Sequence, residues 1–218
     1  MKLCGAIFDF DGTLFDSMSI WDTAGSDYLR SIGKEPEPHL AQILKNMSLF
    51  ESASYLQKTY DIPLNIDTII KGINQTIEEF YFYTTQPKDG VLDFLTKLQK
   101  RDVKMCIATA TDRYLIEAAL KRCKMDLFFQ SILTCSELEH GKGEPIIFEE
   151  ALNSLHTKKE DTLVIEDAFH AIKTAKEAGF STLAIFDEHE EKQEDIRQTT
   201  DFFLFRFTEA DSFLEKNT

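Results

Sequence analysis

The chain opens with an apolar run that leads into two aspartates, a glycine and a threonine, Leu3-Cys4-Gly5-Ala6-Ile7-Phe8-Asp9-Phe10-Asp11-Gly12-Thr13. The apolar part is typical of a strand buried in a parallel sheet. Side chains two residues apart share one face of a strand, so the carboxylates of Asp9 and Asp11 are expected to point the same way. They follow the carboxyl end of this strand, which is where open α/β sheets bind ligands.

Two neighbouring carboxylates repel each other unless they share a cation or a proton. The pair therefore calls for Mg²⁺ or for two pKa values that are pushed apart. One carboxylate can then attack as an ionised nucleophile while the other, protonated, acts as a general acid. Aspartate and glycine are also common where a strand simply leaves a sheet. The whole pattern behind an apolar strand favours a reactive site over such a turn.

From residue 87 onward, short β-rich runs alternate with amphipathic helical stretches. After a first strand at 2–8, strands are expected at 103–108, 131–134, 162–165, 182–186 and 202–205. Two of the intervening helices are expected at 146–155 and 168–178. Strands separated by helices predict βαβ units, and hence an α/β fold with a Rossmann-like parallel sheet flanked by helices.

Residues 17–86 show helical periodicity only, and Ser48-Leu49-Phe50-Glu51 is a capping-box pattern that predicts a helix start. An all-helical block inserted after the first strand predicts a cap domain at 17–86. The α/β core domain is then formed by residues 1–16 and 87–218. Hinges are expected near residues 14–17 and 84–89.

Composition limits the classes of partner. The 218 residues carry 38 acidic and 24 basic side chains, a formal net charge of −14. So acidic a chain repels nucleic acid and anionic membranes, although a bound cation can still admit a phosphorylated substrate. No window approaches the about 18 consecutive apolar residues of a membrane span. The four cysteines form no CxxC pair. The apolar run at the start of the sequence is too short for a signal peptide. No feature of the sequence requires an oligomer. We therefore expect a cytoplasmic monomer, with the acidic segment 187–195 as solvated helix surface.

Three later segments also place polar side chains beside expected strands or helices. Thr109-Ala110 ends a strand just before a helix, where a hydroxyl and nearby amides suit phosphate oxygens. Lys142 precedes the helix at 146–155. The run Leu163-Val164-Ile165-Glu166-Asp167 is an apolar strand that ends in two carboxylates, the hard oxygen ligands that suit Mg²⁺.

In this order, the four segments resemble the motifs of the haloacid dehalogenase superfamily of phosphatases and phosphomutases. The resemblance covers residues 3 to about 179. The helical insertion lies where the phosphoglycolate phosphatase and β-phosphoglucomutase subfamily carries its cap. Three residues depart from the family pattern. Gly143 replaces a proline in the lysine loop, Ala168 replaces the serine after the acidic pair, and His170 replaces the glycine that usually lies two residues beyond that serine.

The resemblance implies a hydrolase that removes phosphate from a small phosphorylated metabolite. Asp9 would attack phosphorus and form an aspartyl-phosphate. Asp11 would protonate the leaving oxygen and later deprotonate the water that hydrolyses the intermediate. Mg²⁺ would be bound by Asp9, Asp167 and the backbone carbonyl of Asp11, with Glu166 holding a metal-bound water. The residues expected to hold the phosphoryl oxygens are Thr109, Ala110 and Lys142.

Other activities of the same family are set apart by single residues. Haloacid dehalogenases lack the second aspartate, so Asp11 argues against that chemistry. β-Phosphoglucomutases add a hinge histidine and a cap arginine; Trp21 stands near the place of the histidine, and residues 45–48 lack the arginine. A phosphomutase is thus the alternative, and a noncatalytic binding module is disfavoured because binding needs no nucleophile. The candidate specificity residues are Trp21, Asp22, Lys45, Asn46 and Tyr81.

Overall fold

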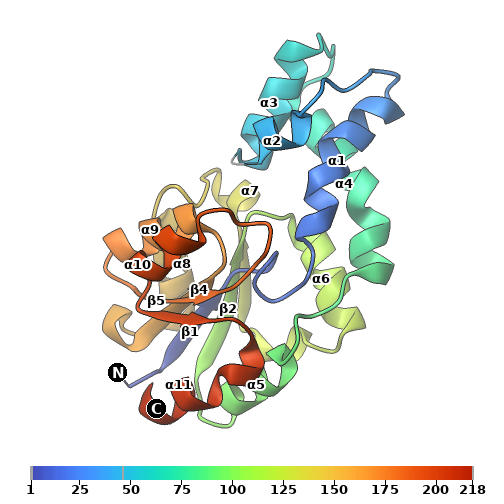
Figure 1. Cartoon of the computed structure of the whole chain (residues 1–218). Coiled ribbons are helices and arrows are strands. Elements are labelled where there is room, and N and C mark those ends of the chain that lie inside the picture. Colours follow the sequence, from blue (N-terminus) through green and yellow to red (C-terminus); the bar gives the residue numbers. More distant parts are fainter. Residues whose placement is uncertain (1, 46, 218) are drawn as a thin grey trace. The chain divides into compact units, whose positions relative to one another are not determined.

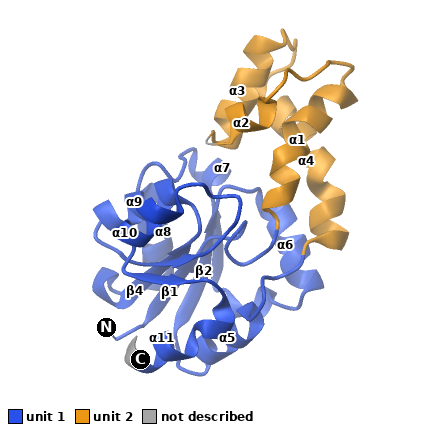
Figure 2. Cartoon of the chain, in the orientation of Figure 1, with its two compact units in different colours: residues 1–16, 86–218 blue, residues 17–85 orange. Residues whose placement is uncertain are grey.

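The computed structural model describes residues 2–45 and 47–217, and Figure 1 traces them along the chain. They form two compact units, which Figure 2 colours separately. Unit 1 comprises Met1–Asp16 and Gln86–Thr218, and unit 2 comprises Ser17–Thr85. The second boundary falls one residue before the boundary expected between cap and core. That unit 2 acts as a cap stays a prediction.

Within the described residues, six strands of unit 1 form one parallel sheet. They are β1 (Gly5–Phe8), β2 (Lys104–Thr109), β3 (Ser131–Thr134), β4 (Thr162–Glu166), β5 (Ser181–Ile185) and β6 (Phe202–Leu204). Their order is β3-β2-β1-β4-β5-β6, the doubly wound order of a Rossmann-like sheet. The α/β fold expected from the alternating pattern is confirmed, with strand ends displaced by up to three residues.

Helices connect these strands and cover both faces of the sheet (Figure 1). In unit 1 they are α5 (Val91–Gln99), α6 (Arg113–Arg122), α7 (Cys135–Leu138), α8 (Ile146–Leu155), α9 (Phe169–Glu177), α10 (Gln193–Thr199) and α11 (Asp211–Asn217). Short 3₁₀ turns lie at Asp126–Phe128, Lys159–Asp161 and Phe207–Glu209. The helix expected at 146–155 is confirmed, and the one expected at 168–178 is one residue shorter at each end.

The strand β1 shows how the core is divided between the two faces. Ile7 belongs to a buried cluster with Phe148 of α8 and Val164 of β4. The next side chain, Phe8, packs edge-on against Phe94 of α5, with ring centroids 6.2 Å apart. Alternation along the strand thus sends consecutive apolar residues to opposite layers. Because both faces are covered, β1 is buried throughout and its carboxyl end is held in place.

Helices joined by loops make up the described residues of unit 2, which contain no strand. Unit 2 contains α1 (Met18–Ser31), α2 (Leu40–Leu44), α3 (Leu49–Thr59), α4 (Ile66–Glu79) and a π-helical turn at Phe80–Thr84. The capping box expected at the start of α3 is confirmed, because the Ser48 hydroxyl accepts from the Glu51 amide while the Glu51 carboxylate accepts from the Ser48 amide. None of the helices in the described part of the chain is long and apolar enough to cross a membrane. The monomeric state and the cytoplasmic location stay predictions.

The two chain segments that flank unit 2 are bonded to each other. The Asp16 amide donates to the Gln86 carbonyl at 3.0 Å, and the Lys88 amide donates to the Leu14 carbonyl at 2.9 Å. Between these bonds Phe15 and Pro87 form an antiparallel bridge. The outgoing and returning segments therefore form a short two-stranded stem within unit 1.

The acidic segment 187–195 differs from its expected form as solvated helix surface. The helix α10 begins only at Gln193, and Asp187 is 3% exposed. Its carboxylate accepts from the ammonium of Lys88 at 2.7 Å and from the His189 amide at 2.9 Å. A run of acidic residues is usually exposed to solvent. Here Lys88 of the stem neutralises Asp187, and this pairing makes the burial of Asp187 possible.

Gly72 offers a test of packing in unit 2, because α4 lies directly on the ring of Tyr28 in α1. A Cβ at this position would lie 2.3 Å from Tyr28 Cε2, and Tyr28 is only 2% exposed. Overpacking costs about 1–3 kcal/mol, whereas alanine gains at most about 1 kcal/mol of helix propensity over glycine. We expect Gly72→Ala to lower the free energy of unfolding, as measured by thermal or denaturant melts. Gly143→Ala, whose Cβ would meet nothing within 4 Å, is the matched control. An unchanged melting temperature for Gly72→Ala would contradict the expectation.

Candidate active site

Three buried carboxylates meet at the carboxyl ends of β1 and β4. The Asp9 amide donates to the Ile165 carbonyl at 2.9 Å, which extends the pairing of β1 with β4 by one residue. Asp9 therefore lies beside Glu166, the last residue of β4, and Asp167, which follows it. One carboxylate oxygen from each of the three lies within 4.8 Å of the others, and all three residues are at most 6% exposed.

The turn after β1 closes on this cluster. The amides of Leu14 and Phe15 both donate to the Phe10 carbonyl at 2.9 Å, and Gly12 has a φ of +76°, which favours glycine. The turn brings the buried hydroxyl of Thr13 to Asp167, where it donates to Oδ1 at 2.8 Å. Thr13 is part of the first motif, but the sequence predicted no role for it. The structure shows that Thr13 orients the carboxylate of the residue that follows β4, 154 positions further along the chain.

Lys142 supplies the positive charge in the cluster. Its ammonium is buried, and it donates to Asp9 Oδ1 and to Glu166 Oε1, the latter at 2.6 Å. Burial alone would lower the pKa of Lys142, but the carboxylates of Asp9 and Glu166 raise it above its ordinary value. Lys142 is therefore charged. The sequence interpretation gave Glu166 a metal-bound water; in the structure its Oε1 accepts from Lys142.

One ammonium does not balance three carboxylates. Burial raises the pKa of Asp9 to about 7, although Lys142 opposes the shift. Burial also raises the pKa of Asp167, together with the negative charges of Asp9 and Glu166. Among the described residues, none provides a hydrogen-bond partner for the buried Glu166 Oε2. Hard oxygen donors, excess negative charge and an unpartnered carboxylate oxygen together fit a divalent cation held by Asp9, Glu166 and Asp167.

The second aspartate of the motif lies beside the end of β2. Thr111 donates its hydroxyl to Asp11 Oδ2 at 2.6 Å, and its amide donates to the hydroxyl of Thr109 at 3.1 Å. Thr109 is fully buried as the last residue of β2, and Ala110 follows it. The structure thus brings Thr109 and Ala110 to the same sheet edge as Asp9. Their contacts with phosphate, and the metal contact of the Asp11 carbonyl, stay predictions.

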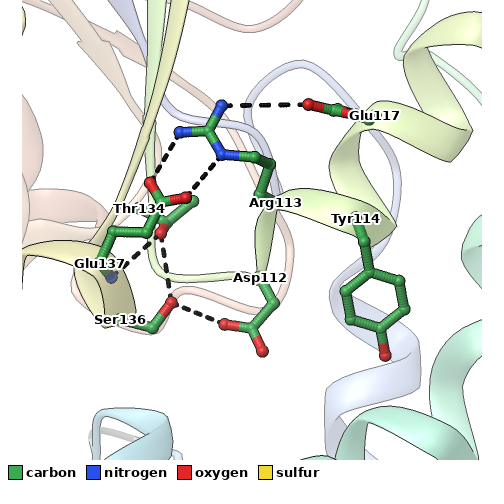
Figure 3. Close-up of a pocket in the computed structure, with 7 residues that line it drawn as sticks. All are labelled: Asp112, Arg113, Tyr114, Glu117, Thr134, Ser136 and Glu137. Carbon is green, nitrogen blue, oxygen red and sulfur yellow. Dashed lines mark hydrogen bonds and ion pairs between the residues drawn. The ribbon is translucent and has the colours of Figure 1, made fainter.

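A shallow pocket of about 310 Å³ opens at the start of α6 (Figure 3). Its lining residues are Asp112, Arg113, Tyr114, Glu117, Thr134, Ser136 and Glu137. Arg113 donates to both oxygens of Glu137, at 2.6 and 2.7 Å, and to the Ile132 carbonyl. Ser136 donates to Asp112 at 2.7 Å. Because its arginine is already paired with a carboxylate, the pocket is not arranged to receive a phosphate group.

The candidate specificity residues lie in unit 2. Trp21 donates its indole N–H to the hydroxyl of Tyr81 at 3.0 Å, and Tyr81 is fully buried. Asp22 and Lys45 are exposed, and Asn46 lies outside the described residues. The hydrogen bond between Trp21 and Tyr81 gives these two side chains a structural role within unit 2. A contact of any of the five residues with substrate stays a prediction.

Comparison with known proteins gives a consistent result. The family model for haloacid dehalogenase-like hydrolases matches residues 6–185. Pyrophosphatase PpaX of Bacillus mycoides is 27% identical over 191 residues, 85% of this chain and 84% of that protein. PpaX of Anoxybacillus flavithermus is 25% identical over 216 residues, 98% of each chain.

Two solved structures share the fold at low sequence identity. CbbY from Rhodobacter sphaeroides, solved in complex with phosphate, superposes with a TM-score of 0.84 at 19% identity and covers 96% of each chain. β-Phosphoglucomutase from Clostridium difficile superposes with a TM-score of 0.78 at 15% identity, over 98% of this chain and 96% of its own. At such identities the likeness shows the fold alone.

Mg²⁺ provides a direct test of the carboxylate cluster. A ligand that binds only the folded state at 100 times its Kd stabilises that state by about 2.7 kcal/mol, so we expect Mg²⁺ to raise the melting temperature and EDTA to reverse the rise. Asp167→Asn removes one cluster charge and should lose most of the rise. Asp93→Asn, at an exposed aspartate of α5, is the control and should keep it. Equal rises in Asp167→Asn and wild-type protein would rule out Asp167 as a ligand.

Proposed function

The chain belongs to the haloacid dehalogenase-like hydrolases and is a phosphatase, and we propose that it releases phosphate from a small phosphorylated metabolite through an aspartyl-phosphate on Asp9. The observation that carries this proposal is the buried cluster of Asp9, Glu166, Asp167 and Lys142. A nucleophilic carboxylate held next to a lysine and a cation-binding site suits attack on a phosphoryl group.

In the first step an oxygen of Asp9 bonds to phosphorus as the bond from phosphorus to the leaving oxygen breaks. Lys142 lies against Asp9 and offers its positive charge to the phosphoryl oxygens that approach the same carboxylate. Bound Mg²⁺ would supply further positive charge, which favours the ionised carboxylates and polarises the phosphoryl oxygens. Thr109 and Ala110, at the end of β2, would complete the phosphoryl contacts.

Proton transfer is assigned to Asp11. Its protonated carboxyl would give a proton to the leaving oxygen and become a carboxylate. The same carboxylate would then take a proton from the water that attacks phosphorus, which releases phosphate and restores both Asp9 and the acid form of Asp11. Its place two residues beyond Asp9, held by Thr111, supports this role.

The relatives named pyrophosphatase make inorganic pyrophosphate a second candidate substrate. The same cluster would act on it, with phosphate as the leaving group. A screen of phosphate release from pyrophosphate, 2-phosphoglycolate and sugar phosphates separates the candidates. Conversion of β-glucose 1-phosphate into glucose 6-phosphate, without free phosphate, would instead support the phosphomutase alternative.

Removal of the nucleophile tests the covalent mechanism. Asp9→Asn keeps the shape of the side chain but loses its nucleophilic charge, so we expect Mg²⁺-dependent hydrolysis of p-nitrophenyl phosphate to fall by at least about 1,000-fold. The exposed Asp93→Asn again serves as control. Undiminished turnover by Asp9→Asn would exclude an aspartyl-phosphate on Asp9.

Asp11 separates acid–base chemistry from metal binding. Because the proposed metal contact of Asp11 is through its backbone carbonyl, Asp11→Asn should lose about 100-fold or more in kcat while keeping Mg²⁺ affinity close to that of wild-type protein. Calorimetric titration with Mg²⁺ measures the affinity. A loss of affinity as large as that of Asp167→Asn would mean that the Asp11 carboxylate itself binds the metal.

A further inference from the structure

Thr111 makes a contact that none of the motifs accounts for. It lies just beyond β2 and is 2% exposed, and its hydroxyl donates to Asp11 Oδ2 at 2.6 Å. Its amide meanwhile donates to the hydroxyl of Thr109 at 3.1 Å. Both partners belong to unit 1 and both are proposed participants in the reaction. One residue thus bonds to the proposed acid and to the proposed phosphate ligand.

The bond is of a kind that fixes orientation. Once Asp11 has given up its proton, a hydroxyl that donates to its carboxylate over 2.5–2.7 Å forms a short, charge-assisted hydrogen bond, which is stronger than one between neutral groups. Threonine is branched at Cβ, so few rotamers are open to it, and burial limits competition from water. Asp11 itself lies in a turn that contains Gly12, whose φ is +76°. Its carboxylate is therefore held by the rigid end of β2 as well as by its own turn.

We propose that Thr111 is a positioning residue that orients the carboxyl of Asp11 toward the leaving-group oxygen. This inference rests on the proposed function. The proton passes from Asp11 to the leaving oxygen as the bond from phosphorus to that oxygen breaks. Thr111 keeps its own proton and donates a hydrogen bond to the carboxylate that this step creates. It acts through Asp11 and need not touch the substrate.

If Thr111 only stabilised the contact between the turn after β1 and the end of β2, it would make the same hydrogen bond. The test must therefore measure proton transfer. Phenyl phosphate and 2,4-dinitrophenyl phosphate serve as matched probes. Phenolate, whose conjugate acid has a pKa of about 10 like that of tyrosine, needs a proton as it leaves, whereas dinitrophenolate leaves as a stable anion. The ratio of kcat/KM for the two probes therefore measures help from a general acid, because kcat/KM includes departure of the leaving group.

We expect Thr111→Val to lower kcat/KM for phenyl phosphate by about 10-fold or more and for 2,4-dinitrophenyl phosphate by less than about threefold, since misplaced catalytic groups lose rate steeply. Thr111→Ser, which keeps the hydroxyl, should restore the wild-type ratio. Thr162→Val is the matched control: Thr162 is also fully buried, at the start of β4, and bonds to the Lys158 carbonyl. It should leave the ratio unchanged.

The double variant Asp11→Asn with Thr111→Val gives an independent reading. If Thr111 acts through Asp11, the added Thr111→Val should change the phenyl phosphate rate of Asp11→Asn by less than about twofold, because coupled residues are not additive. Equal losses for both probes in Thr111→Val, or full additivity in the double variant, would overturn the proposal. If Thr111→Val does not fold, Thr111→Ala against Thr111→Ser makes the same comparison. Failure of wild-type protein to release phosphate from either probe would refute the proposed function, and this inference with it.

Discussion

The excess of buried negative charge at the ends of β1 and β4 is the constraint on which the site depends. Parallel pairing of these strands places Asp9, Glu166 and Asp167 together, and the sheet cannot separate them without losing its register. Lys142 neutralises one charge and leaves two. Burial of unbalanced charge is costly, so a stable fold of this kind needs either protons or a cation at this edge. Strand pairing itself thus creates a cluster whose charge and oxygen donors suit a divalent ion.

The same constraint explains features farther from the cluster. Asp187, at the end of β5, adds another buried negative charge whose field reaches Asp167 and contributes to the raised pKa of that residue. Lys88 and the His189 amide satisfy Asp187, and the pKa of Asp187 stays below its usual value through these contacts despite burial. Pairing of Asp187 within unit 1 thus prevents a third uncompensated carboxylate. Thr13, by donating to Asp167, disperses charge in a similar way.

The sequence predicted what depends on local pattern and missed what depends on distant partners. Apolar runs and their alternation with helical stretches were enough for the sheet and for the capping box at Ser48. The motifs were enough to place Asp9, Lys142 and Asp167 at one sheet edge. Thr111 and Asp187 were missed because their partners lie 100 and 99 residues away along the chain, and no spacing rule connects them. Isolated threonines and acidic runs look like ordinary surface in a single sequence.

The stem, in which the Lys88 amide bonds to the Leu14 carbonyl, affects how the fold tolerates changes in the length of the inserted segment. Its hydrogen bonds, both within unit 1, hold together the two segments that flank Ser17–Thr85. The entropy of closing a loop rises only slowly with length, by about 0.6 kcal/mol per doubling. We therefore expect unit 1 to keep its strand order and register when the segment between the two stem strands is exchanged or deleted.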